Sequence, residues 1–322
     1  MATDLRKIRA PAKVNLGLRL VGVRSDGYHL LESLFAPIEI WDDLEIEVLA
    51  GEPGIELEVV ETSFPGLGDS PESGASGLSL ESLFAVPDGS DNLALRAAAA
   101  FCKETGFHRR IRLRLTKRIP AGAGLGGGSS DAAAVLLGLA SLADRKVADE
   151  ILYSIALGLG ADVPFFLSPG PALVSGIGEK IERLGGIRPL DLVVMNPGVL
   201  LATKEVYRAA DALHGALTDG RPGSTMRAIS KMRSETGDLA PALGELLIND
   251  LEPAARRLCP PIARLSERLQ EAGAIGVSMS GSGATVFGVF ASGELAKRAA
   301  EELRISEVKE CWIEVTRIIA AD

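Results

Sequence analysis

Residues 110–115 alternate strictly between arginine and an aliphatic residue. A period of two predicts a β-strand with one charged face and one apolar face. Less regular apolar runs predict further strands, which cover 7–23, 34–49, 190–195, two segments within 275–290, and 308–319. Within the second of these, Trp41-Asp42-Asp43 indicates a turn between two strand-like runs.

Helix-forming residues separate these strands. The predicted helices cover 91–102, 129–143, 147–159, 203–215, 224–234, 240–247, 251–272 and 293–304. The first begins at Asp91-Asn92, two residues that favour N-cap positions. This order of strands and helices predicts an α+β fold with antiparallel strands. A change of composition near 168–190 indicates a boundary, so we expect one domain at 1–174 and a second at 175–322.

Residues 50–90 differ from the rest of the first domain. Glycine, serine, proline and acidic residues dominate them. Such a composition gives a segment too little apolar surface to form a core of its own. We therefore expect a peripheral insertion near 50–90 and not a third domain.

The bulk composition narrows the class of protein. The chain has 322 residues, 47% of them hydrophobic, which is enough for about two domains with sizeable cores. No apolar run reaches the roughly 20 residues of a membrane span, and no apolar signal core follows the N-terminus, so we expect a cytoplasmic protein without a membrane partner. The net charge of −9 argues against nucleic acid as a partner. The three cysteines have neither metal-binding nor disulfide spacing.

The segment Pro120-Ala-Gly-Ala-Gly-Leu-Gly-Gly-Gly-Ser-Ser-Asp131 connects the arginine-rich strand to a predicted helix. Glycine permits positive φ and lets a ligand approach the main chain closely. A helix that begins near Ser129 and Ser130 directs free N–H groups and the positive end of its dipole toward this loop. The loop is therefore an expected anion site, most often one for a nucleotide phosphate.

Other known classes of glycine-rich segment match the sequence of this loop less well. No Gly-Lys-Ser/Thr follows at Walker spacing. Gly122, Gly124 and Gly127 satisfy G-x-G-x-x-G, but a dinucleotide-binding fold would require a strand that is apolar on both faces. A protein-kinase loop leads into another strand, and a flexible linker has no reason to end in a helix start. These comparisons favour a phosphate loop that opens directly into a helix.

This loop resembles the phosphate loop of the GHMP kinase superfamily. Six motifs occur in the order typical of that superfamily: Pro11-Ala-Lys13-Val-Asn15-Leu, Asp26-Gly-Tyr28-His29, the loop 120–131, Gly160-Ala-Asp162-Val-Pro-Phe-Phe, Asn249-Asp-Leu-Glu-Pro253, and Ser278-Met-Ser-Gly-Ser-Gly-Ala-Thr285. The resemblance extends from about residue 8 to about residue 290. It implies a two-domain α+β fold, with a ribosomal S5 domain 2-like N-terminal domain and a ferredoxin-like C-terminal domain.

The resemblance also implies that the loop binds ATP together with Mg²⁺. The residues implied in ATP binding are Pro120, Gly122, Gly124, Leu125, Gly126, Gly127, Gly128, Ser129 and Ser130, with Asn92 near the adenine. The ligands of the metal are left open. Ser130 and Asp131 are candidates, although a carboxylate in the first turn of a helix is also explained by the helix dipole.

Two residues match the catalytic positions of the superfamily. Lys13 lies in an otherwise apolar strand, where the sequence alone is equally consistent with a half-exposed lysine whose ammonium reaches water. Asp162 precedes a Val-Pro pair, where a turn or helix-cap aspartate is equally consistent. The resemblance implies that Asp162 is the catalytic base and Lys13 the catalytic lysine. A nearby ammonium would keep the carboxylate ionised and offset charge on the transferred phosphoryl group.

The motifs around Asp26 and Asn249 point to those members that act on a cytidine diphosphate methylerythritol. The implied substrate-binding residues are Asn15, Tyr28, His29, Tyr207, Gly281 and Ser282. Taken without the resemblance, Tyr28-His29 is better explained as a turn aromatic beside a surface histidine. Tyr207 is equally consistent with packing within a helix, and the segment 280–285 is also consistent with an ordinary hairpin turn.

The resemblance implies that ATP phosphorylates the C2 hydroxyl of this small-molecule substrate, a step in non-mevalonate isoprenoid synthesis. We expect the enzyme to be a monomer or weak dimer. Two alternatives remain at this point: a GHMP kinase acting on a mevalonate or sugar substrate, and a nucleotide-binding protein that keeps the fold without catalysis. The presence of both Lys13 and Asp162 argues against the second alternative.

Overall fold

The structure is a computed structural model that describes residues 4–60, 83–86, 89–214, 243–307 and 311–320. Its first sheet has the strand order β3-β4-β2-β5-β6, and β1 pairs with β2. These six strands are β1 (Asp4–Val23), β2 (His29–Leu49), β3 (Gly54–Val60), β4 (Arg110–Thr116), β5 (Ala172–Gly176) and β6 (Lys180–Arg183). All the pairs are antiparallel except β3 with β4.

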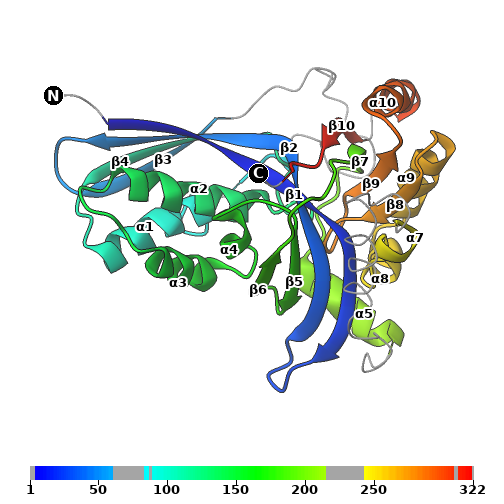
Figure 1. The fold of residues 1–322 in the computed structure, drawn as a ribbon, viewed down its shortest axis with the longest axis horizontal. Helices are drawn as coiled ribbons and strands as arrows, with labels where there is room; N and C mark the ends of the chain where they lie inside the picture. The colour runs from blue at the N-terminus through cyan, green and yellow to red at the C-terminus, as the bar shows by residue number, and fades with distance from the viewer. Residues whose placement is uncertain (1–3, 61–82, 87–88, 215–242, 308–310, 321–322) are drawn as a thin grey trace.

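The second sheet has the order β10-β7-β9-β8 and is antiparallel throughout. Its strands are β7 (Asp191–Asn196), β8 (Gly276–Met279), β9 (Val286–Phe290) and β10 (Trp312–Arg317). Figure 1 shows the two sheets toward opposite ends of the molecule, with the long β1–β2 hairpin reaching from the first toward α5. Mixed helices and two largely antiparallel sheets confirm the expected α+β fold.

Helices cover one face of the first sheet and pack around the second (Figure 1). Those beside the first sheet are α1 (Leu93–Thr105), α2 (Gly127–Leu142), α3 (Asp149–Leu159) and α4 (Val163–Phe166). Those that follow are α5 (Thr203–His214), α7 (Leu243–Leu246), α8 (Glu252–Leu258), α9 (Pro261–Glu271) and α10 (Gly293–Glu307). Among the described residues, no helix combines the length and apolar character needed to cross a membrane.

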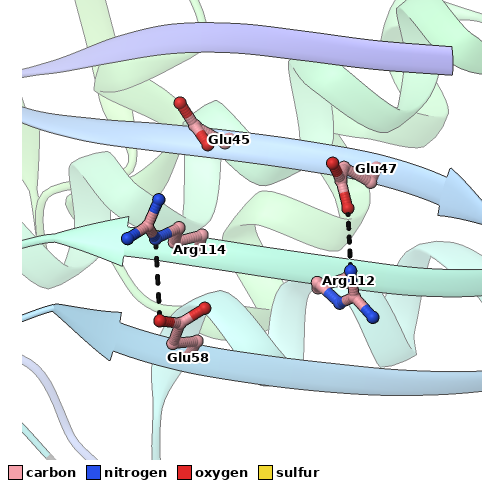
Figure 2. Close-up of a pocket in the computed structure, with 5 residues that line it drawn as sticks. All are labelled: Glu45, Glu47, Glu58, Arg112 and Arg114. Carbon is pink, nitrogen blue, oxygen red and sulfur yellow. Dashed lines mark hydrogen bonds and ion pairs between the residues drawn. The ribbon is translucent and has the colours of Figure 1, made fainter. Parts of the chain in front are cut away.

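The predicted two-faced strand is β4. Its aliphatic residues are buried, and Arg112 and Arg114 are exposed on the face that carries no helix. Arg112 pairs with Glu47 of β2 at 3.2 Å, and Arg114 pairs with Glu58 of β3 at 3.6 Å. Figure 2 shows these pairs across the three strands, where they line a shallow pocket with Glu45. Each of these two arginines faces a carboxylate on the neighbouring strand. Cross-strand ion pairs therefore balance the positive charge on this face of the sheet.

Most predicted elements on the described residues are confirmed, and two differ. The predicted turn at 41–43 is wrong, because β2 continues through it with Asp42 buried. The single helix predicted at 251–272 is broken into α8 and α9 at Cys259, where Pro260 and Pro261 follow. A proline restricts the residue before it and cannot donate a helical hydrogen bond.

The expected insertion near 50–90 is only partly described. Its beginning is not irregular but forms β3, which pairs in parallel with β4. Residues 61–82, and the helix predicted at 224–234, lie outside the described residues. The domain boundary after residue 174 stays a prediction; it lies within β5, and β6 of the first sheet follows it.

Gly17 of β1 makes close backbone contact with α7 and the residues that follow it. The Leu18 amide donates to the Ile248 carbonyl at 2.9 Å, and a Cβ added at Gly17 would lie 2.2 Å from the Leu246 carbonyl oxygen. We predict that Gly17→Ala destabilises the fold by about 1–3 kcal/mol, because backbone on both sides must shift. Gly22→Ala in the same strand is the control, since its Cβ would meet only Leu30 at 3.7 Å. Urea unfolding midpoints measure both, and equal midpoints would contradict the prediction.

Candidate active site

The glycine loop precedes α2 and has the expected backbone geometry. Gly122, Gly124 and Gly126 have φ of 59°, 79° and 72°, a region that favours glycine. Gly126 occupies the N-cap position, and the amide of Ser130 makes a helical bond to its carbonyl at 2.9 Å. The three amides before Ser130 therefore have no acceptor within the helix. A loop of this shape, opening into a 16-residue helix, can bind an anion through its main chain.

A second glycine-rich segment packs directly against this loop. Ser280 donates its hydroxyl to the Gly124 carbonyl at 2.9 Å and accepts the Asn15 amide at 3.2 Å. A Cβ added at Gly124 would lie 2.1 Å from the Ser280 carbonyl oxygen, so only glycine fits. Gly281, with φ of 58°, lies close to Gly124 in the same contact. The segment after β8 is therefore more than a hairpin turn, because it forms a wall beside the loop.

Lys13 is buried in β1, with only 3% of the residue exposed. Its ammonium donates to Asn15 Oδ1 at 2.6 Å, lies 3.8 Å from Asp162 Oδ2 and sits 4.7 Å from the centre of the Phe35 ring. Burial lowers the pKa of Lys13, and the charge of Asp162 partly restores it. The alternative of a half-exposed lysine is thus wrong.

Asp162 lies at the start of the one-turn helix α4, but its side chain makes no capping hydrogen bond. Its carboxylate is about a third exposed, at 35%, and faces Lys13. A Cβ added at Gly126 would lie 3.2 Å from Lys13 Cγ and 2.9 Å from Phe166 Cζ of α4. The Lys13 amide also donates to the Leu125 carbonyl at 2.9 Å. The structure therefore brings Lys13, Asp162 and the glycine loop to one place.

His29 and Tyr207 lie together where the β1–β2 hairpin meets α5. Their ring centroids are 4.9 Å apart, and His29 Nε2 lies 2.7 Å from Asp211 Oδ1. Burial, with a smaller effect of the Asp162 charge, raises the pKa of Tyr207 to about 12. Tyr28 is 60% exposed at the hairpin tip, 5.5 Å from the Arg24 guanidinium, and is not brought into this contact.

The remaining predicted residues are placed as follows. Asn92 caps α1 by accepting the Ala94 amide at 2.8 Å, and Leu93 beside it contacts the position of Gly128. Ser282 shares a hydrogen bond of 2.9 Å with Thr203 at the start of α5. The Ser130 hydroxyl and the Asp131 Oδ1 atom are buried without a hydrogen-bond partner among the described residues.

Several residues that support this site through hydrogen bonds or ion pairs were not predicted from the sequence. Asn249 donates to the carbonyls of Met279 and Gly281, both at 2.8 Å, and so supports the second glycine segment. Ser33 accepts from the Asn15 amide nitrogen at 2.8 Å. Lys117 and Asp42 form an ion pair beneath the loop. Of these only Asn249 stood in a motif; the others gave no sequence signal, because their partners are far away in the chain.

Comparison with known proteins gives independent results. A family model described as the GHMP kinases N terminal domain matches residues 92–170, and one described as GHMP kinases C terminal matches residues 227–309. The chain is 39% identical over 297 residues to a 4-diphosphocytidyl-2-C-methyl-D-erythritol kinase of Citrifermentans bemidjiense, covering 92% of this chain and 94% of that one. It is 37% identical to the kinase of the same name from Mesorhizobium japonicum, covering 100% and 99%.

Solved structures agree with these relatives. The crystal structure of a 4-(cytidine 5'-diphospho)-2C-methyl-D-erythritol kinase superposes with a TM-score of 0.72 at 36% identity, covering 98% of this chain and 100% of that one. A mevalonate kinase from L. major in complex with R-mevalonate has the same TM-score at 17% identity, covering 99% and 98%. At that identity the second likeness concerns the fold alone.

Proposed function

The chain belongs to the GHMP kinase family, and from that membership we propose that it transfers the terminal phosphoryl group of ATP to the C2 hydroxyl of 4-diphosphocytidyl-2-C-methyl-D-erythritol. It is an ATP-dependent kinase with a small-molecule alcohol as acceptor, as its relatives are named. The observation that carries the site assignment is the meeting of Lys13, Asp162 and the glycine loop in one place.

In this proposal Asp162 receives the proton of the acceptor hydroxyl as the new P–O bond forms. A carboxylate within hydrogen-bond reach of the hydroxyl suffices for this role. Lys13, whose ammonium lies 3.8 Å from that carboxylate, offsets charge on the phosphoryl group in transit. Asn15 Oδ1 accepts from Lys13 and its amide nitrogen donates to Ser33, so Asn15 orients the lysine in addition to its predicted contact with the substrate.

The loop residues 120–130 hold the polyphosphate through main-chain amides and the dipole of α2. For Mg²⁺, the Ser130 hydroxyl and Asp131 Oδ1 are oxygen donors of the type it prefers, and both lack hydrogen-bond partners in the part of the chain that is described. No group of three or more His, Cys, Asp or Glu that could hold a metal ion gathers among those residues. When bound, Mg²⁺ would offset the charge of the phosphates.

The cytidine is assigned to the side of the site formed by His29 and Tyr207. A pyrimidine needs a ring surface to stack on and a polar partner at its edge. Tyr207 and His29 lie 4.9 Å apart and offer one of each, with exposed Tyr28 available to close over the base. Gly281 and Ser282 form the wall between this side and the phosphate loop. We propose that the substrates occupy a cleft between the domains at 1–174 and 175–322.

The test is phosphorylation of defined alcohols with labelled ATP. The expected acceptor is 4-diphosphocytidyl-2-C-methyl-D-erythritol, with mevalonate and homoserine as comparison alcohols. Mass spectrometry or ³¹P NMR of the product locates the new phosphate on C2. Transfer to mevalonate with none to the cytidine compound would overturn the substrate assignment and leave the kinase assignment intact.

Tyr207 provides a specific test of the cytidine side. We predict that Tyr207→Leu raises the KM for the cytidine substrate by roughly 5–150-fold, because stacking of a base on an aromatic ring contributes about 1–3 kcal/mol. The KM for ATP should stay nearly unchanged. Tyr207→Phe is the matched control, since it keeps the ring and should keep most of the affinity. Equal effects of both variants, or a parallel loss of ATP affinity, would contradict the stacking role.

A further inference from the structure

A buried cluster of three ionisable residues lies beneath the phosphate loop. The Lys117 ammonium donates to Asp42 and, at 3.0 Å, to Asp131 Oδ2. The side chains of Lys117, Asp42 and Asp131 are 1%, 0% and 4% exposed. Burial opposes the charge on Lys117, but the carboxylates of Asp131 and Asp42 outweigh it, and the pKa of Lys117 is raised. Buried ion pairs of this kind add little stability compared with apolar residues of similar size, so their use here calls for another explanation.

The cluster holds both ends of the phosphate loop. At the entry, Asp42 Oδ1 accepts the amides of Arg118 and Ile119 at 2.6 and 2.9 Å. At the exit, Asp131 belongs to α2, and a Cβ added at Gly127 would lie 3.2 Å from the Lys117 ammonium nitrogen. Lys117 therefore lies against the first residue of the helix whose free amides face the loop. One carboxylate of β2 and one ammonium after β4 tie these two ends together.

No side chain caps the N-terminus of α2 and fixes its first turn in the usual way. Gly126 at the N-cap has no side chain, and no acidic residue lies in the first turn of α2. Asp131 is the fifth residue of α2 and lies past the positions where a side chain caps free amides. The contact of Asp131 with Lys117 therefore links α2 to the sheet beside the first turn of the helix.

We propose that Lys117 is a positioning residue for nucleotide binding, which acts by joining Asp42 of the sheet to Asp131 of α2 and so fixes both ends of the phosphate loop. This inference rests on the proposed function, since it assumes that the loop binds the phosphates of ATP. Lys117 acts through the main chain of the loop and is assigned no contact with the reacting groups. Geometry at such a site is sensitive, because a shift of about 1 Å can cost about 100-fold in rate.

The experiment compares Lys117→Met and Asp42→Asn with the matched controls Lys7→Met and Asp43→Asn. Lys7 and Asp43 lie on the exposed side of the same sheet and pair with Glu45 and Arg118. The Kd for ADP, measured without metal, is expected to rise about 10-fold or more in the cluster variants, because the loop amides lose their fixed position. The Kd for CDP, used as a probe of the cytidine side, should change by less than about twofold. Amide hydrogen exchange of residues 120–131 should speed up only in the cluster variants.

A further variant serves as a control for a general loss of stability. Phe101→Leu, in the core of α1, lowers stability without touching the cluster and should leave the Kd for ADP unchanged. If Lys117→Met fails to fold, Asp42→Asn carries the test, because it leaves Lys117 paired with one carboxylate. Unchanged ADP affinity and unchanged exchange in 120–131, or equal loss of ADP and CDP binding, would overturn the inference. Failure of the unaltered protein to bind ADP at all would instead overturn the proposed function.

Discussion

Asp162→Asn is expected to lower kcat by about 10²–10⁴-fold, the range that a positioned general base contributes. Asparagine has nearly the same shape but cannot accept the proton of the acceptor hydroxyl. The change also removes the charge that raises the pKa of Lys13 against the effect of burial, so less of the lysine stays protonated. Both effects act on the chemical step. The Kd for ATP should be nearly unchanged, since the loop amides that bind the phosphates are not altered.

The measurement is single-turnover phosphoryl transfer together with equilibrium binding of ATP. Asp144→Asn is the control: Asp144 is an exposed carboxylate, 81% accessible, that pairs with Arg109 on the surface. Its kcat should equal that of the unaltered enzyme. Unchanged turnover in Asp162→Asn would exclude the base role. A loss of turnover matched by an equal loss of ATP affinity would instead indicate that Asp162 acts in nucleotide binding.

The parts of this site that sequence predicted are those in which the chemistry is local. The loop 120–131 contains its own positive-φ glycines and its own helix start, and the alternation in β4 directly predicts a buried and an exposed face. The GHMP kinase resemblance then supplied Lys13 and Asp162, each of which had an equally plausible structural explanation. The burial of Lys13 and the missing capping bond of Asp162 now argue against both of those explanations.

Features that depend on long-range pairing were not predictable in this way. Asp42 lies in a Trp-Asp-Asp sequence typical of a turn, yet it is buried in a continuous strand because Lys117, 75 positions away, provides its partner. Two charged residues that are unremarkable in sequence thus become a buried pair through tertiary contact. His29 and Asp211, which are 182 positions apart, also come together only through tertiary contact. Local secondary-structure propensity cannot predict such pairs, because the two side chains interact only after the strands and helices have assembled.

Gly124→Ala is expected to reduce kcat/KM by about 100-fold or more, because the site depends on backbone contact between two glycine segments. At φ of 79° an L-residue is strained by roughly 1–2 kcal/mol. The added methyl would also lie 2.1 Å from the Ser280 carbonyl oxygen. Separating these atoms to ordinary contact needs a shift of about 1 Å, and both partners are main chain. The loop must therefore move relative to Ser280, which also binds the Asn15 amide beside Lys13.

Gly106→Ala separates the steric effect from the conformational one. Gly106 follows α1 with a similar φ of 70°, but a Cβ there would have nothing within 4 Å. Both variants should lose stability in urea unfolding, Gly124→Ala the more because its methyl also meets main chain, and only Gly124→Ala should lose activity and ADP affinity. Equal activity of the two would mean that the loop tolerates displacement from Ser280. In that case the phosphate site would depend on the first turn of α2 alone, and the wall formed by residues 280–283 would contribute nothing to catalysis.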